Sequence, residues 1–514
     1  MRRYQLAYGA SSFATGPAFG GYASYVSFQI QNIGYLIGHE PGNAPGSGCD
    51  FFATTCLVPM AGAGDINLTS FILYLNAISY AVSGALVFIV AGIGDYTDYK
   101  REQYIFFIIV YGALCLPITA LTGYSTSIYN TLAGLYVVFN IIGFLVQVWG
   151  NIFIPYCMRE MHEEASESKN VEVEASTEGN LVVAEQMHAT VSTRMDREIR
   201  GVRMSIWGSN SLNLSILIFY VVVICLIVAS ATTAAGLTMT TVAGAVCLFL
   251  ALVAWPFLPS PSGRPLPEGK SWFMLPFTTF AQMFQAVYRY PDAFRFLLAY
   301  TIYNDTLFAF GTVTGTLFNL TFRPSLLEFT GYSMVGPGVS IIVGTAWRYI
   351  FPRTSLTLRH WAIISYSIVA FIAFWAILGM SPHIAIGFKQ RWEFYLMAVL
   401  QNAAGAIVSP LFRVLFSELF PKGSEIRFFG FQLVLSCSTT WIPQVINGPI
   451  VNATNNIRLP AAVCLPAFLI CIALAWWTDD VRGAALVESE RHQDEEQRAR
   501  GPEPLLTRGP KLKN

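Results

Sequence analysis

The sequence predicts an all-α integral membrane protein with about twelve transmembrane helices, arranged as two six-helix halves. Long apolar segments recur along the chain, and stretches such as 215–229, 241–258 and 361–380 approach the length that a helix needs to cross about 30 Å of hydrocarbon. Composition agrees with this class, because 54% of the residues are hydrophobic and only 12% are charged, against roughly 25% charged residues in soluble domains.

The expected spans follow one another in order and are separated mostly by short polar turns. They cover residues 12–37, 70–93, 104–122, 129–157, 205–229, 234–258, 293–320, 332–351, 360–380, 393–414, 427–449 and 459–478. The chain therefore divides into an N-terminal half (1–258), a linker (259–292), a C-terminal half (293–478) and a tail (479–514).

The distribution of Lys and Arg tests this topology independently of hydropathy. With the N-terminus in the cytosol, nearly every basic residue falls in a cytosolic segment, as the positive-inside rule requires. The basic residues expected on the other side are Arg323, Lys389, Arg391 and Arg458. A missed or an added span would scramble this asymmetry.

Three polar segments lie outside the expected spans. Residues 159–204 form a cytosolic loop that is rich in Glu, Ser and Thr without a sustained apolar period, so we expect disorder there. The mixed-charge run 488–500 in the tail is expected to form an exposed helix. In the linker, the aromatic and apolar stretch 272–288 suits either an interfacial helix or a segment packed on the bundle.

The segments expected outside the cytosol contain candidate modification sites. Cys49 and Cys56 lie in a Gly/Pro-rich loop in which a disulfide can form. Asn67 and Asn452 each begin an Asn-x-Ser/Thr sequon and are candidate glycosylation sites. The other cysteines show no metal-ligand spacing, so no metal or cofactor is expected, and the zero net charge gives no indication of a nucleic-acid partner.

A charged patch follows the second span, in the stretch from Ala91 to Arg101. Small residues lead into Asp95, and Lys100 and Arg101 follow in the turn. The pattern resembles the signature of the major facilitator superfamily between its second and third helices. That resemblance implies that Asp95 latches one transport state, with Lys100 and Arg101 as its partners. Ordinary cytosolic charges that obey the positive-inside rule are the alternative.

The seventh span carries an ionisable group in the sequence Tyr303-Asn304-Asp305. A charge within the bilayer is costly unless it faces a cavity or a partner, so Asp305 is a candidate for binding a proton or a substrate ammonium group. Asn304 is a candidate to assist it. The alternative is a structural Asp305 paired with Thr306 or with a hydroxyl on a neighbouring helix.

A third patch lies in the turn between the tenth and eleventh spans. Glu418, Lys422, Glu425 and Arg427 gather there and suit a state-dependent ion-pair gate. A solvated turn is the alternative, because exposed ion pairs contribute little.

These patches, with 417–443, 290–294 and 451–458, resemble the fungal autophagy-related vacuolar effluxers, a branch of the major facilitator superfamily. The resemblance implies a monomeric multi-pass protein of the vacuolar membrane that exports neutral amino acids such as leucine to the cytosol by alternating access. Proton coupling through Asp305 would use the acidity of the lumen.

Three other kinds of function were weighed. An enzyme is not expected, because the chain lacks the HExxH and GxSxG motifs and a phosphate-binding Gly loop and has only six His. A plasma-membrane carrier of another small organic solute is the alternative among transporters. A non-transporting membrane sensor or scaffold, which would bind a ligand without net flux, stays open as well.

Overall fold

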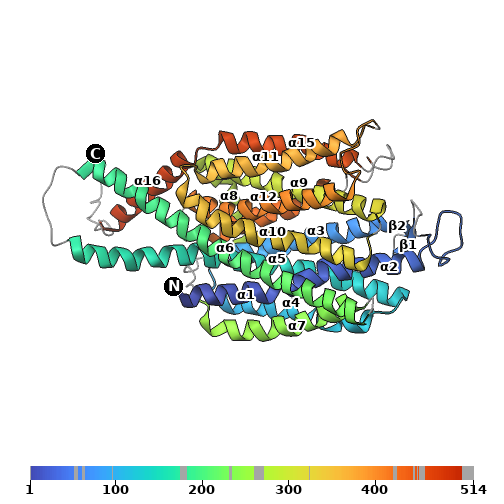
Figure 1. Ribbon diagram of the computed structural model, residues 1–514. Helices are drawn as coiled ribbons and strands as arrows, with labels where there is room; N and C mark the ends of the chain where they lie inside the picture. The colour runs from blue at the N-terminus through green and yellow to red at the C-terminus, as the bar shows by residue number, and fades with distance from the viewer. Residues whose placement is uncertain are drawn as a thin grey trace, which may run out of the picture.

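The apolar segments of the chain form long helices that lie side by side in one bundle (Figure 1). The structure is a computed structural model and describes residues 2–50, 56–60, 64–94, 96–173, 182–230, 234–259, 271–322, 324–381, 383–420, 425–443, 446–447, 450 and 458–499. The helices α8 and α16 mark one end of the bundle, called the tail end below. A β-hairpin marks the opposite, hairpin end.

The first half of the chain begins with a helix that continues through one π-helical turn. Its elements are α1 (Arg2–Gly20), the π-turn η1 (Gly21–Val26), α2 (Ser27–Ile37), β1 (Leu57–Met60), β2 (Gly64–Asn67), α3 (Leu68–Gly94), α4 (Lys100–Ala113), η2 (Leu116–Leu121), α5 (Thr126–Val173), α6 (Val182–Ser230), α7 (Ala235–Ala254) and η3 (Trp255–Phe257).

The second half repeats the up-and-down course of spanning helices. Its elements are α8 (Leu275–Arg289), α9 (Pro291–Phe322), α10 (Leu326–Ile350), η4 (Phe351–Arg353), α11 (Leu358–Leu378), α12 (Arg391–Glu418), α13 (Glu425–Thr439), α15 (Leu459–Trp477) and α16 (Asp480–Ala499). Nine helical stretches of the described chain are long and apolar enough to cross a membrane. The other predicted spans, 12–37, 293–320 and 427–449, correspond to α1–α2, α9 and α13 in the same bundle.

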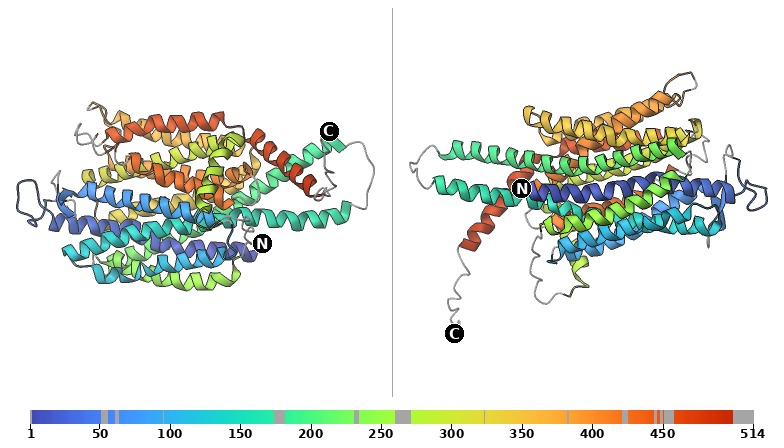
Figure 2. Two further views of the ribbon diagram at one scale, coloured as in Figure 1. Left: turned by 180° about the vertical axis from the view of Figure 1, so that it is seen from behind. Right: turned by 60° about the horizontal axis from the view of Figure 1, so that its bottom comes forward.

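The sequence predicts disorder over 159–204, and the structure describes helix in part of that segment. The helices α5 and α6 continue through 159–173 and 182–204 and extend beyond the bundle at the tail end (Figure 2). Neither stretch contains proline, the residue that breaks a helix most strongly. A helix that is already nucleated inside the bundle propagates into such sequence at little further cost.

The linker and the tail both contain helices that contact the bundle. In α8, Leu275, Thr279 and Met283 are buried, while Phe277 and Phe284 are exposed. The stretch 272–288 thus packs on the bundle and presents aromatic side chains outward, while its place in the membrane interface stays a prediction. The tail helix α16 begins at Asp480, earlier than the predicted start at residue 488.

The hairpin end carries an element that the sequence did not predict. β1 and β2 pair antiparallel, with Leu57 opposite Asn67. The possible disulfide between Cys49 and Cys56 is formed, and His39 lies 3.7 Å from the Asp65 carboxylate. Asn67 is half-buried in β2, and its glycosylation stays a prediction. Asn452 lies outside the described residues.

The two halves meet tightly along α3 and α13. A Cβ atom placed on Gly84 would lie 3.3 Å from Cβ of Cys437, and one placed on Gly430 would overlap Cβ of Ala91. The small residues are seven positions apart in each helix, so they repeat on one face. Small side chains at such positions let two helix backbones approach closely.

Candidate functional site

Asp305 lies in the middle of α9 and is 5% exposed. Three hydroxyl groups at the end of α13, two on the helix and one on the residue that follows it, donate hydrogen bonds to its carboxylate. Ser436 donates to Oδ1 at 3.2 Å, Thr440 also donates to Oδ1, and Thr439 donates to Oδ2. Residues at i, i+3 and i+4 share one face of a helix, so α13 presents its hydroxyls to α9 together.

Two of these hydroxyls have a second acceptor within reach. Thr439 lies 2.9 Å from the carbonyl oxygen of Leu435, and Thr440 lies 2.8 Å from that of Ser436. Each hydroxyl carries one proton. It can therefore donate to an ionised Asp305 or return to its own helix when the carboxyl group is protonated.

No Lys or Arg of the described chain lies within 4 Å of Asp305. The carboxylate is thus buried with hydroxyl donors but without a counter-ion in the part of the chain that the structure describes. Because a buried charge needs compensation, this arrangement favours a group that takes up and releases a proton, or one that binds a cationic ligand.

The N-terminal half approaches this site through Tyr80 of α3. Its ring contacts Phe308 edge to face, with centroids 5.6 Å apart, and its phenol lies within the electrostatic reach of Asp305. Asn304 is half-buried. Asp305 therefore lies where α9, α13 and the opposite half meet.

Hydroxyls of a neighbouring helix, and not Thr306, are the partners of Asp305. The sequence did not identify Ser436, Thr439 and Thr440 as those partners. Their helical spacing was a usable signal, but nothing in the sequence shows which helix faces α9.

The predicted gating residues are brought partly together at the tail end. Arg427 of α13 donates to the Tyr96 hydroxyl at 3.1 Å, which joins the two halves, and to Oε1 of Gln282 in α8 at 3.2 Å. Arg101 instead binds the adjacent Glu102 at 2.7 Å, and Lys100 is buried.

The remaining gating candidates are less fully described. Glu418 is the last residue of α12 and is half-buried. Glu425 is the first residue of α13, and Asp95 lies outside the described residues. The latch role of Asp95 and the ion-pair gate stay predictions.

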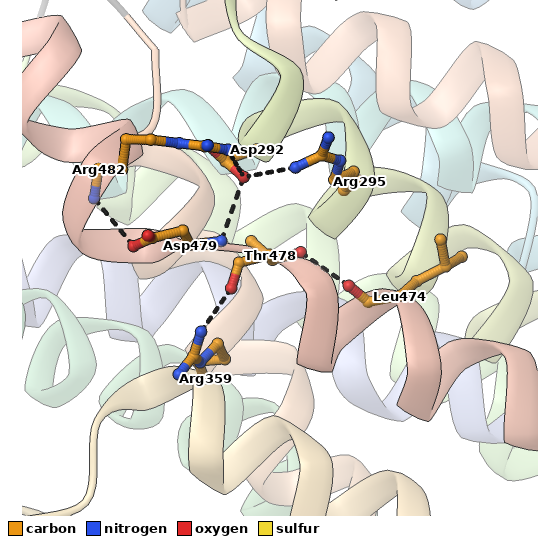
Figure 3. A network of polar contacts seen from close by, with 7 residues as sticks. All are labelled: Asp292, Arg295, Arg359, Leu474, Thr478, Asp479 and Arg482. Atoms are coloured by element: carbon orange, nitrogen blue, oxygen red, sulfur yellow. Dashed lines mark hydrogen bonds and ion pairs between the residues drawn. The ribbon is translucent and has the colours of Figure 1, made fainter.

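A second polar network anchors the tail helix (Figure 3). The Asp292 carboxylate, which is 3% exposed, accepts from Arg295 at 3.1 Å, from the Asp479 amide at 3.1 Å and from Arg482 at 2.7 Å. Arg359 donates to the Thr478 carbonyl oxygen at 2.6 Å. The network ties the first turn of α9 to the start of α16.

At the surface of this network, hydrogen bonds and charges favour the ionised form of Asp479. The backbone amide and the charge of Arg482 hold the pKa of Asp479 below its usual value. Further along α16, Glu490 accepts from Arg289 at 2.7 Å and from the Tyr290 hydroxyl at 2.5 Å. The tail helix is thus fixed to the junction of α8 and α9 at two places.

At the hairpin end, the Glu393 carboxylate organises the turn before α12. It accepts from the Trp375 indole at 2.8 Å and from the backbone amides of Gly387 at 2.6 Å, Phe388 at 2.8 Å, Lys389 at 3.2 Å and Gln390 at 2.9 Å. Gly387 and Phe388 both have positive φ values, of 100° and 57°. The carboxylate therefore holds a turn that a non-glycine residue rarely adopts.

The sequence as a whole matches one family. The profile of the family described as "Vacuole effluxer Atg22 like" covers residues 1–487. The chain belongs to this Atg22-like family. Autophagy-related protein 22 of Candida albicans is 26% identical over 484 residues, which cover 92% of this chain and 88% of that protein. A protein of the same name from Botryotinia fuckeliana is 27% identical over 232 residues, or 42% of this chain and 34% of that one.

Solved structures share the fold of this Atg22-like chain. The human organic anion transporter MFSD10 (TETRAN) has a TM-score of 0.58 at 13% identity and covers 92% of this chain and 99% of its own. The transporter FucP of the major facilitator superfamily, in the outward conformation, has a TM-score of 0.55 at 12% identity and covers 92% and 98%.

Family and fold together confirm the predicted class. The protein is a multi-pass membrane transporter with the major facilitator fold, and it is not an enzyme. The prediction of an autophagy-related effluxer family is confirmed as well.

Proposed function

We propose that the protein exports neutral amino acids such as leucine from the vacuolar lumen to the cytosol, and that a proton moves with each amino acid through Asp305. The single observation that carries the coupling is the buried Asp305 carboxylate with three hydroxyl donors on α13. The names of the family and of its autophagy-related relatives support the vacuole as the compartment.

The proposed mechanism is alternating access between the two halves, 1–258 and 293–478. These halves would rock about the Asp305 site, which lies at mid-helix depth. Asp95, Lys100 and Arg101 would form the gate at the cytosolic end together with Glu418, Glu425 and Arg427. The bond from Arg427 to Tyr96 supports this gate, because it must break when the halves part there.

Proton uptake would begin on the acidic lumenal side. A protonated Asp305 no longer needs all three donors, so Thr439 and Thr440 can turn to the carbonyl oxygens of their own helix. That change loosens the contact between α9 and α13. Release of the proton on the cytosolic side restores the three hydrogen bonds.

The test is leucine flux in proteoliposomes with and without a pH gradient. A gradient of two pH units can drive at most about a hundredfold accumulation with one proton per leucine, since one pH unit corresponds to about 1.36 kcal/mol. Asp305→Asn, which mimics the protonated carboxyl, should retain leucine counterflow and lose the acceleration by the gradient. Acid-stimulated flux that persists in Asp305→Asn would exclude the coupling role.

A matched pair of threonine variants refines this test. Thr440→Val removes one donor to Asp305 and favours the protonated carboxyl, so half-maximal acid stimulation should move to a higher pH. Thr312→Val makes the same change at a half-buried position of α9 whose hydroxyl donates to its own helix, and it should leave the pH dependence unaltered.

The test also separates the other functions. Saturable flux of a different organic solute, with a tagged protein at the plasma membrane, would favour the alternative carrier. Binding of leucine without flux would favour a sensor or scaffold.

A further inference from the structure

Arg413 is a cation at the tail end of the tenth predicted span, 393–414, on α12. It donates one long hydrogen bond, of 3.4 Å, to the Ser205 hydroxyl of α6. No carboxylate of the described chain lies within 4 Å of its guanidinium. A charge within a membrane span requires a partner or a water-filled space, and one neutral hydroxyl at this distance is a weak partner.

Arg413 is half-buried and shares one face of α12 with other residues that are not fully buried. Between Ala404 and Ser417 the residues that are not buried are Gly405, Ala406, Ser409 and Arg413. Positions 406, 409 and 413 follow helical spacing and form one stripe on α12. The hydrogen bond from Arg413 to Ser205 of α6 shows that the Arg413 end of this stripe faces the N-terminal half.

The stripe begins near the level of Asp305 and ends at Arg413. The ring of Tyr300, five residues before Asp305 on α9, stacks on Phe412 with centroids 3.6 Å apart. Five residues correspond to about 7.5 Å along a helix. Arg413 and Asp305 therefore lie at two levels of the bundle, with Tyr300 near the level of Arg413.

We propose that Arg413 binds the carboxylate of the transported amino acid on the tail-end side of Asp305. This inference rests on the proposed function and adds the recognition of a free carboxylate to it. A guanidinium presents its N–H groups as a planar fork that matches both oxygens of a carboxylate. The substrate would then be oriented with its carboxylate toward Arg413 and its ammonium toward Asp305.

A competition assay tests this assignment directly. Leucine counterflow in proteoliposomes is inhibited with unlabelled leucine or with leucinamide, which keeps the side chain and the amine but lacks the carboxylate. Wild-type protein should prefer leucine over leucinamide by about tenfold to a hundredfold, the loss expected for one charged hydrogen-bonded contact. Arg413→Gln should raise the KM for leucine by the same factor and abolish the preference.

Two further variants control for charge and for folding. Arg203→Gln removes a positive charge from an exposed position of α6 at the tail end and should leave KM and preference unchanged. Arg413→Lys keeps the positive charge but lacks the planar pair of N–H donors, so it should retain part of the preference for leucine over leucinamide. If Arg413→Gln does not insert into the membrane, the Arg413→Lys protein is compared with the wild type instead. The quantity measured is then the thermal stabilisation of each protein by leucine.

Each outcome is decisive. Retention of the full preference for leucine in Arg413→Gln would overturn the proposal. A lower maximal rate with unchanged KM and preference would also overturn it and would make Arg413 a gating residue only. Absence of leucine flux in the wild-type protein would instead reject the proposed function.

Discussion

Gly430→Leu is predicted to push α3 away from α13 at the tail end of the bundle. A Cβ atom on Gly430 already overlaps Cβ of Ala91, which is 1% exposed. The helix α3 has no free space behind this contact, because Gly92, the next residue, packs directly on Pro276 of α8. The new side chain can be accommodated only if the two halves separate there.

The size of the effect follows from this packing. Forcing extra methylene groups into a packed site costs about 1–3 kcal/mol. If the state with separated halves avoids that cost, the equilibrium between the two states shifts by about 5-fold to 140-fold, since about 1.4 kcal/mol corresponds to a factor of ten.

Thiol labelling measures this shift. Ser409→Cys places a thiol on the α12 stripe, and Cys225→Ser removes the one free thiol that is exposed among the side chains that the structure describes. The labelling rate by an impermeant reagent added on the tail-end side should rise within the range given above. Gly134→Leu is the matched control, because Gly134 is exposed on α5 with open space around its Cα. An unchanged labelling rate in correctly inserted Gly430→Leu protein would refute the argument.

Two further predictions concern the ends of the bundle. Glu393→Ala leaves five hydrogen-bond donors without their acceptor. It should lower the free energy of unfolding by at least about 3 kcal/mol, measured by thermal unfolding in detergent. A loss below about 1 kcal/mol would show that water replaces the carboxylate. Asp292→Asn removes the charge that binds Arg482 and should release α16, so that its amides exchange with deuterium faster, while equal exchange in both proteins would show that the Glu490 contacts suffice.

The sequence alone determined the class and the topology of the protein. Apolar length and the asymmetry of basic residues are local properties of the chain, and they predicted the spanning helices and the two halves. The cost of a charge in the bilayer singled out Asp305 for the same reason. Helix continuation past residue 158 was not predicted, because polar composition alone does not distinguish disorder from a helix extended out of a packed bundle.

Tertiary structure decided which side chains meet across helices. The hydroxyls of α13 lie about 130 positions from Asp305 in sequence, and Arg427 reaches Tyr96 across 331 positions. Whether such residues meet depends on the depth and the rotation of each helix, which only packing against its neighbours fixes. Arg413 went unnoticed among the basic residues of the tail end, because its position between the halves follows from the face that α12 turns toward α6.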